Sequence, residues 1–361
     1  MTDTTVVAEA ATPVTEPAAA PGDTAEKPTG LKPVIDVIPE HCYQRSLGRG
    51  LFLLARDLVF YGFAIWGLLS TNNPLFLVPL WLLAGFSVAG LFVLGHDAAH
   101  GSLFDSKRLN AVVGRLTMLP SLHVTSAWEF GHNRVHHGHT LKQGMDFVWH
   151  PITADEYAEM GRFARLRHRF EWSPFGAGAY YLREVWWNKM ITFPPPKRNA
   201  RDFRRDKAIV AAFAFGVLAV LLIASGPIGL WSWVKVVVIP FLLFCQAIGW
   251  VVYVHHISPE IRWWPRREWN RYRGQVEGTT VLHGPPGWDL FFHWIMVHLP
   301  HHVDMRIPSY RLEEAAEAIK AAYPDDVDER PIRLRDYLRA TRECKVHDFQ
   351  TGEWSRYPTT A

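Results

Sequence analysis

The sequence predicts an all-α integral membrane protein in which four membrane-spanning helices form two hairpins, with a helical cap on one side of the membrane. Three observations predict this class: apolar residues gather into four stretches, short connections join the stretches in pairs, and histidine clusters follow them on one side. The 361-residue chain is 48% hydrophobic, which is ordinary for a globular protein. The distribution of apolar residues, rather than their amount, therefore carries the prediction.

The four stretches cover residues 58–69, 74–95, 208–224 and 231–254. A helix needs about 20 apolar residues to cross a bilayer, and the second stretch has 22 residues without a charge. The first is short alone, and apolar residues 51–55 extend it upstream across Arg56 and Asp57. A buried helix of a soluble protein stays an alternative for it. The fourth carries only Lys235, near an end from which its amine can reach the membrane surface.

The connections and the charges predict the topology. Residues 70–73 join the first two stretches and a turn around 226–230 joins the last two, so each pair predicts a hairpin. The region 96–207 between the hairpins carries 17 Lys and Arg. Since basic segments stay on the cytoplasmic side, we expect this region and both termini in the cytoplasm.

The ends of the chain differ from its centre in composition. Residues 1–30 are mostly Ala, Pro, Thr and Glu, which predicts a disordered tail. This segment has no apolar signal region and is not acid-poor, so we expect a bacterial cytoplasmic membrane rather than secretion or an organelle. The predicted organisation is a disordered tail over 1–30, a membrane domain over 31–312 and a cytoplasmic C-terminal tail over 313–361.

Charge and cysteine content exclude several classes of protein. The net charge of +3 predicts no nucleic-acid partner. The three cysteines lie far apart and form no CxxC pair. Disulfide frameworks, zinc ribbons and iron–sulfur clusters therefore have no support.

The 18 histidines are the unusual feature, because they cluster. One cluster follows the second stretch, one lies in the middle region and one lies near the C-terminal side, and a further pair closes the fourth stretch: His96 and His100; His132, His136 and His137; His298, His301 and His302; His255 and His256. Spacings of three and four residues place imidazoles on one helix face. Packing histidines together is unfavourable unless a metal takes their lone pairs.

Eight or nine imidazoles exceed the three or four ligands of a zinc site. Iron suits imidazole ligands and oxygen chemistry, so the sequence predicts two irons with four or five ligands each. The Glu-x-x-His motifs of carboxylate di-iron bundles are absent from these clusters. A histidine-rich di-iron site held in the cytoplasmic cap is the predicted alternative to that design.

Several segments carry a family resemblance. They are IPEHCYQRSL at 38–47, GHDAAHGS at 95–102, HNRVHH at 132–137 followed by Thr140 and DFVW at 146–149, and HLPHH at 298–302 leading to IPSY at 307–310. Together they resemble the membrane fatty acid desaturase family, in particular the bacterial type of its Δ12 (omega-6) acyl desaturase branch. The resemblance covers residues 38–312.

The resemblance implies oxygen-dependent desaturation of a fatty acyl lipid, from oleoyl to linoleoyl, with O2 as co-substrate. The electron donor would be a separate ferredoxin-like or cytochrome b5-like protein, because no fused heme segment is visible. It implies nine iron ligands: the eight histidines of the three clusters and His256, with His255 as the alternative. Asp97 is expected to orient a ligand imidazole from behind.

The other histidines are expected not to be ligands. His41, His168, His283 and His347 are isolated, whereas His123, His139, His150 and His293 lie nearer the clusters, where hydrogen bonds to ligands are conceivable. Two alternatives to desaturation stay open at the level of sequence. One is an acyl hydroxylase or a carotenoid or alkane oxygenase of the same di-iron class, and the other is a membrane metal- or heme-binding protein without oxygenase activity.

Overall fold

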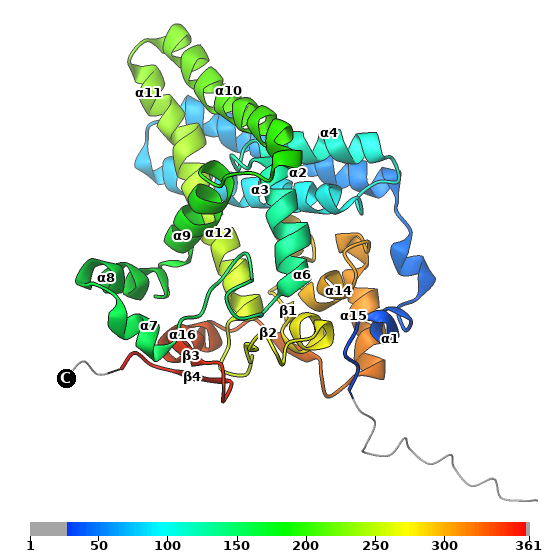
Figure 1. Ribbon diagram of the computed structural model, residues 1–361. Coiled ribbons are helices and arrows are strands. Elements are labelled where there is room, and N and C mark those ends of the chain that lie inside the picture. Colours follow the sequence, from blue (N-terminus) through cyan, green and yellow to red (C-terminus); the bar gives the residue numbers. More distant parts are fainter. Residues whose placement is uncertain (1–26, 359–361) are drawn as a thin grey trace, which may run out of the picture.

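The computed structural model describes residues 27–358, and Figure 1 shows two helical hairpins joined to a cap of shorter elements. The first 26 residues of the predicted disordered tail lie outside the described residues. Four helices are long and apolar enough to cross a membrane, as predicted.

The first hairpin consists of α2 (Leu47–Ser70) and α3 (Pro74–His100). Ser46 accepts a hydrogen bond from the Arg49 amide at the start of α2, and Asn73 caps α3 in the same way. Helix α2 continues through Arg56 and Asp57, as the predicted upstream extension of the first span requires. Asp57 is 2% exposed and binds His293 Nε2 at 2.6 Å. This distant partner lets a charged pair stay inside the helix.

The second hairpin consists of α10 (Ala200–Ser225), followed after a turn at Gly226 by α11 (Ile228–Trp233), the π-helical η5 (Val234–Val238) and α12 (Ile239–His256). Lys235 is 2% exposed, and its amine extends to the turn at the end of the first hairpin. Its amine donates to the Thr71 carbonyl at 2.9 Å and to Asn72 Oδ1 at 3.0 Å. These bonds tie the second hairpin to the turn of the first.

The two hairpins have an inner and an outer layer. The most apolar window of α3 is 61% buried and that of the second-hairpin helix ending in α12 is 56% buried, against 28% for α2 and 11% for α10. Helices α3 and α12 therefore pack together inside, while α2 and α10 expose apolar faces suited to lipid. The inner helices are also the two that carry histidines at their cap ends.

Short elements build the cap. Those before the second hairpin are α1 (Lys32–Ile35), η1 (Glu40–Tyr43), α4 (Lys107–Met118), α5 (Thr125–Glu129), η2 (Phe130–His136), α6 (His137–His139), α7 (Ala154–Glu159), α8 (Arg162–Glu171), α9 (Ala177–Tyr180), η3 (Tyr181–Ile191) and η4 (Lys197–Asn199). Those after it are η6 (Arg273–Glu277), β1 (Thr280–His283), α13 (Asp289–Phe292), α14 (His298–Val303), η7 (Ser309–Arg311), α15 (Leu312–Ala322), β2 (Asp328–Pro331), α16 (Leu334–Glu343), β3 (Val346–Asp348) and β4 (Glu353–Ser355).

The strands are the feature that the helical prediction missed. Strand β1 pairs in parallel with β2, with Thr280 opposite Asp328, and β3 pairs antiparallel with β4. All four are only three or four residues long, too short for a periodicity signal. The β1–β2 pairing crosses the predicted boundary at residue 312, and α15 packs against α14. The division at 312 stays a prediction, but the described residues after it are folded onto the cap.

Candidate metal centre

The histidine clusters converge from five elements at the junction of the hairpins and the cap. Helix α3 ends with His96 and His100 one turn apart, and α12 ends with His256. The second cluster occupies the π-helix η2 and the start of α6, and the third lies on α14. Widened π-helical turns are frequent at functional sites. Every clustered histidine except His100 is buried, and both ring nitrogens of His100 are buried as well.

The imidazoles form two groups of four. In each group the candidate ligand nitrogens all lie within 4.8 Å of one another. The first group is His96, His100, His132 and His301, and the second group is His136, His256, His298 and His302. Nε2 of His96 lies 3.1 Å from Nε2 of His132, and the corresponding atoms of His298 and His302 lie 3.0 Å apart. His137 Nε2 lies 3.2 Å from His132 Nε2, and its ring centroid lies 4.5 Å from that of His302, so the ninth imidazole lies between the two groups.

The nitrogens fit a pair of metal ions. Buried polar atoms are nearly always hydrogen-bonded, yet Nε2 of His256 and His301 and both nitrogens of His100 have no partner among the described residues. Burial lowers the pKa of five clustered histidines in η2, α6 and α14 well below 6.5, and neighbouring imidazoles lower it further. These histidines are His132, His137, His298, His301 and His302. These rings are therefore neutral and offer lone pairs to a metal.

Two carboxylates hold the outer nitrogens of the imidazoles. Asp97 Oδ1 lies 3.2 Å from His96 Nδ1, and Asp97 Oδ2 accepts from the Ser309 amide at 2.8 Å. Asp146 Oδ1 lies 2.8 Å from His136 Nδ1. Burial by itself would raise the pKa of Asp146, but the charge and hydrogen bond of His136 hold the pKa well below its usual range. Such contacts fix the ring orientation of metal ligands.

Further outer contacts come from residues that the sequence did not indicate. Gln275 Oε1 lies 2.6 Å from His302 Nδ1, and Gln275 Nε2 donates to the His137 carbonyl at 2.7 Å. His256 Nδ1 lies 3.1 Å from the Gly278 carbonyl. Asp146 stands in a segment that resembles the desaturase pattern, which is the one signal that could have found it. Gln275 and Gly278 carry no such signal, because their partners lie far away in the chain.

The structure separates the adjacent histidines at the end of α12. His256 enters the second group, whereas His255 stays outside both. The His255 ring stacks on His298 with centroids 4.4 Å apart, and its Nδ1 lies 2.8 Å from the Thr280 hydroxyl. Of the two alternatives from the sequence, the geometry favours His256.

The other eight histidines also stay outside both groups. His41 and His283 contact carboxylates, of Glu314 and Glu329. The remaining six find partners elsewhere: His168 at Tyr357, His347 at the Trp263 amide, His123 at Tyr181, His139 at the Val135 carbonyl, His150 at Lys189 and His293 at Asp57.

Most of the chain matches a known protein family. Residues 45–331 match the family described as Fatty acid desaturase. The chain belongs to this family. It is a membrane fatty acid desaturase with a histidine-rich di-metal site.

Several curated desaturases are similar to the chain along most of its length. The sn-1 oleoyl-lipid 12-desaturase of Anabaena variabilis is 28% identical over 330 residues, which cover 89% of this chain and 91% of that protein. The chloroplastic omega-6 fatty acid desaturase of Arabidopsis thaliana is 30% identical, covering 80% of this chain and 63% of that protein. The endoplasmic reticulum omega-3 fatty acid desaturase of Vigna radiata var. radiata is also 30% identical, covering 93% and 90%. Both regiochemical classes thus occur among the relatives.

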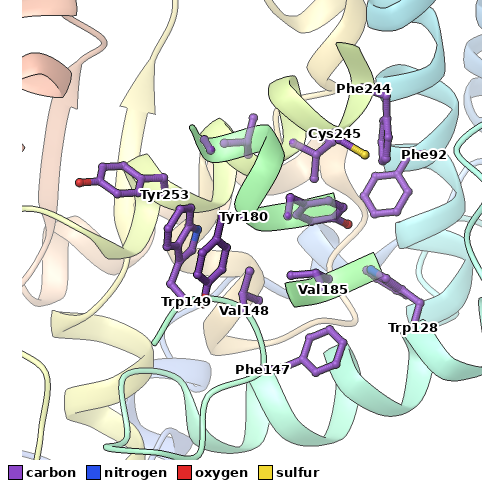
Figure 2. Close-up of a cluster of buried hydrophobic side chains, with 14 of the residues drawn as sticks. Phe92, Trp128, Phe147, Val148, Trp149, Tyr180, Val185, Phe244, Cys245 and Tyr253 are labelled. Atoms are coloured by element: carbon purple, nitrogen blue, oxygen red, sulfur yellow. The ribbon is translucent and has the colours of Figure 1, made fainter. Parts of the chain in front are cut away.

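In this desaturase, an apolar cavity of about 50 Å³ touches the metal centre. His96, His132, His136 and His298 line one side of it. The other walls are apolar, and Figure 2 shows five of them meeting from α3, α5, the 147–148 segment and η3: Phe92, Trp128, Phe147, Val148 and Val185. An acyl chain is the kind of ligand that such a lining accommodates.

A second apolar cavity, of about 270 Å³, lies further along α3 and α12 toward the membrane. Leu82 and Phe86 line this cavity, while Val93 and His96 line the first. Because these positions recur at helical spacing, they share one face of α3. The two cavities therefore follow one seam that leads from the lipid-facing part of the bundle to the histidines.

Proposed function

We propose that the desaturase converts an oleoyl chain of a membrane lipid to linoleoyl, inserting the second double bond at Δ12. The proposal includes two irons held by His96, His100, His132, His136, His137, His256, His298, His301 and His302. The single observation that carries the reaction class is the pair of imidazole groups facing an apolar cavity.

Iron is the metal that this donor set favours. Nine imidazoles, eight of them in two groups of four, suit a divalent transition metal, and the family reaction consumes dioxygen. A bound iron pair supplies the redox chemistry by which O2, two electrons, two protons and two adjacent CH2 groups become a double bond and two waters. Metal analysis of the purified protein is expected to find two irons per chain. One zinc and no iron would overturn the assignment.

The protein's own contribution is to position the acyl chain and to exclude water. Phe92, Trp128 and Val185 are buried and surround the cavity beside the histidines. Holding two CH2 groups against the centre converts an encounter into an intramolecular step. The seam between α3 and α12 supports delivery of the chain from the bilayer, and the relatives named as oleoyl-lipid desaturases support a lipid-bound substrate.

Resemblance supports the Δ12 position. The segment 38–47 and the flank at 146–149 resemble the Δ12 branch, and relatives named as 12-desaturases and omega-6 desaturases match most of the chain. The omega-3 relatives make Δ15 the rival outcome.

Fatty-acid profiling decides between them. The protein is expressed in a host without polyunsaturated lipids, oleate is supplied, and the new double bond is located. Linoleate is the expected product, and a His301→Ala protein serves as the inactive control. A product only from added linoleate, a Δ9 bond in stearate or a hydroxylated oleate would each contradict the Δ12 proposal.

We also infer a bacterial cytoplasmic membrane with both termini and the cap in the cytoplasm, and a separate electron donor. One relative is named as a ferredoxin-dependent omega-3 desaturase, which supports a soluble iron–sulfur donor. A reporter fused after Ala361 is expected to be active on the cytoplasmic side. Activity only on the outer side would contradict this topology.

A further inference from the structure

Residues 262–273, which follow α12 and end at the first residue of η6, form an unusually basic surface segment. The sequence RWWPRREWNRYR contains five arginines and one glutamate, a local charge of +4 in a chain whose net charge is +3. The net charge alone, which predicted no nucleic-acid partner, did not reveal this concentration. Arg266, Arg267 and Arg271 are exposed.

Two tryptophans organise the cations of this segment. The guanidiniums of Arg262 and Arg273 lie 4.1 and 4.2 Å from the ring centroid of Trp264, and the Lys142 amine lies 4.6 Å from that of Trp269. We call this set the arginine–tryptophan surface: Lys142, Arg262, Trp264, Arg266, Arg267, Trp269, Arg271 and Arg273. Arginine and tryptophan are the residue types that dominate binding at protein interfaces.

The backbone fixes the arginine–tryptophan surface against the second histidine cluster. The Trp264 amide donates to the Leu141 carbonyl, and the Gln143 amide donates to the Trp264 carbonyl, both at 3.0 Å. A surface held by such bonds is preorganised, so a partner that binds it loses little conformational freedom.

Only one residue separates this surface from a histidine of the metal centre. Trp269 Nε1 donates to the Thr140 carbonyl at 2.8 Å, and Thr140 Oγ1 lies 3.4 Å from His302 Nδ1. A Cβ on Gly274 would lie 2.6 Å from the Thr140 oxygen and 2.7 Å from Trp269 Nε1, so this close approach requires glycine. The next residue, Gln275, binds His302 directly.

The surface lies away from the apolar helices of the hairpins, which favours a soluble partner over the bilayer. Figure 1 draws this part of the chain in yellow, in the cap and at the far end of the molecule from the α10–α11 turn. The apolar cavities approach the histidines from the opposite side, along α3 and α12. Within residues 27–358, no carboxylate lies within ion-pair distance of Arg266, Arg267 or Arg271, so these charges are available to a partner.

We propose that the arginine–tryptophan surface docks an acidic, soluble one-electron carrier protein. The inference rests on the proposed desaturase function, which requires electrons from outside the chain. A carrier seated on Trp264 and Trp269 would place its redox group above the shortest described connection between the surface and the second histidine group. Acidic carriers are favoured because complementary charge accelerates association and orients the encounter.

The test uses the full-length protein in detergent with an acidic plant-type [2Fe–2S] ferredoxin as probe, and with cytochrome b5 as a second probe. Arg267→Glu/Arg271→Glu reverses two exposed charges of the surface. Lys107→Glu/Arg108→Glu reverses two exposed charges at the first turn of α4 and is the matched control; glutamate suits a helix N-terminus, so α4 keeps its start. Binding of the oxidised probes is measured against salt, and anaerobic electron transfer from the reduced probes is measured beside reduction by methyl viologen.

The surface variant is expected to bind at least one probe about tenfold more slowly at low salt, and the difference is expected to vanish at 1 M salt, where screening acts within about 3 Å. Its reduction by viologen and the behaviour of the control stay as in the parent protein. Equal binding by the parent and the surface variant, equal losses in both variants, or no salt-dependent binding of either probe to the parent would overturn the proposal. So would a loss confined to binding of phosphatidylglycerol vesicles.

Binding of the oxidised probes needs no iron in the desaturase. A protein that lacks iron but still shows the charge-dependent binding would therefore refute the di-iron proposal and leave the docking surface supported. Normal iron content with unchanged probe binding in the surface variant would refute the docking surface and leave the di-iron proposal supported.

Discussion

Asp146 offers the sharpest test of how outer contacts support the metal centre. Its Oδ1 accepts hydrogen bonds from His136 Nδ1 at 2.8 Å and from the Val148 amide at 3.1 Å. Its Oδ2 accepts a hydrogen bond from the Leu141 amide at 3.0 Å. In Asp146→Asn, the amide oxygen can keep the first two bonds, and the amide nitrogen faces the Leu141 N–H. In Asp146→Ala, all three donors lose their partner.

These geometries give different magnitudes for the two variants. A buried donor without a partner costs about 1–3 kcal/mol, so Asn should lose about that amount of stability and Ala up to three times as much. Removal of an outer partner typically weakens metal binding 10–100-fold, which is about 1.4–2.7 kcal/mol. Because His136 belongs to the second group, one of the two irons should be affected first.

Iron release to a graded series of chelators, with thermal unfolding in detergent, measures both effects. Asp97→Asn is the matched comparison, since Asp97 contacts His96 of the first group. We expect one weakened and one normal iron in each Asn variant, and a markedly lower Tm in Asp146→Ala. Two irons held at parent affinity in Asp146→Asn, or a parent Tm in Asp146→Ala, would refute the reasoning.

Three other predictions follow from the contacts. His256→Ala should lose iron from the second group and abolish desaturation, whereas His255→Ala should retain both irons; metal analysis distinguishes them, and equal iron loss would contradict the assignment. Val185→Phe narrows the cavity beside the histidines, so conversion of oleate should fall about 100-fold, the cost of a 1 Å misplacement, while the iron content stays unchanged. Lipid profiling measures the conversion, and conversion at the parent level would argue against this cavity as the acyl site. Burial lowers the pKa of three histidines outside the metal centre from 6.5 to about 4: His123, His168 and His347. Below pH 6.5 the unfolded chain therefore binds more protons than the folded protein does. The free energy of unfolding should accordingly fall as the pH drops from 6.5 toward 4. A Tm of the metal-free protein that stays constant or rises over that range would contradict this sign.

Local patterns predicted the parts of the fold that local chemistry decides. Four apolar stretches and their short connections gave the two hairpins, because lipid requires long uninterrupted helices. What the sequence could not show is why a charged pair is tolerated inside α2: the Asp57 carboxylate is satisfied by His293, 236 residues away. The Lys235 amine likewise finds distant partners, Thr71 and Asn72, in the turn of the first hairpin. No local rule can anticipate partners at that separation.

The sequence also identified the histidines but not how they divide. His96 and His100 enter the same group, but His132 and His136 separate, and so do His301 and His302. In α14 the adjacent residues His301 and His302 point about 100° apart around the helix, which lets them enter different groups. In η2 it depends on π-helical turns, which are too rare to predict from one sequence. The clusters in sequence and the groups in space are therefore different sets.

This division has a consequence for how the hairpins and the cap are held together. The first group draws its nitrogens from α3, η2 and α14, and the second from η2, α12 and α14. Each bound metal would thus join one inner membrane helix to the same two cap elements. Metal binding is coupled to folding when the ligands come together only in the folded state. The cap ends of α3 and α12 and the order of η2 and α14 should accordingly depend on both metals, while the outer helices α2 and α10, which carry none of these histidines, should not.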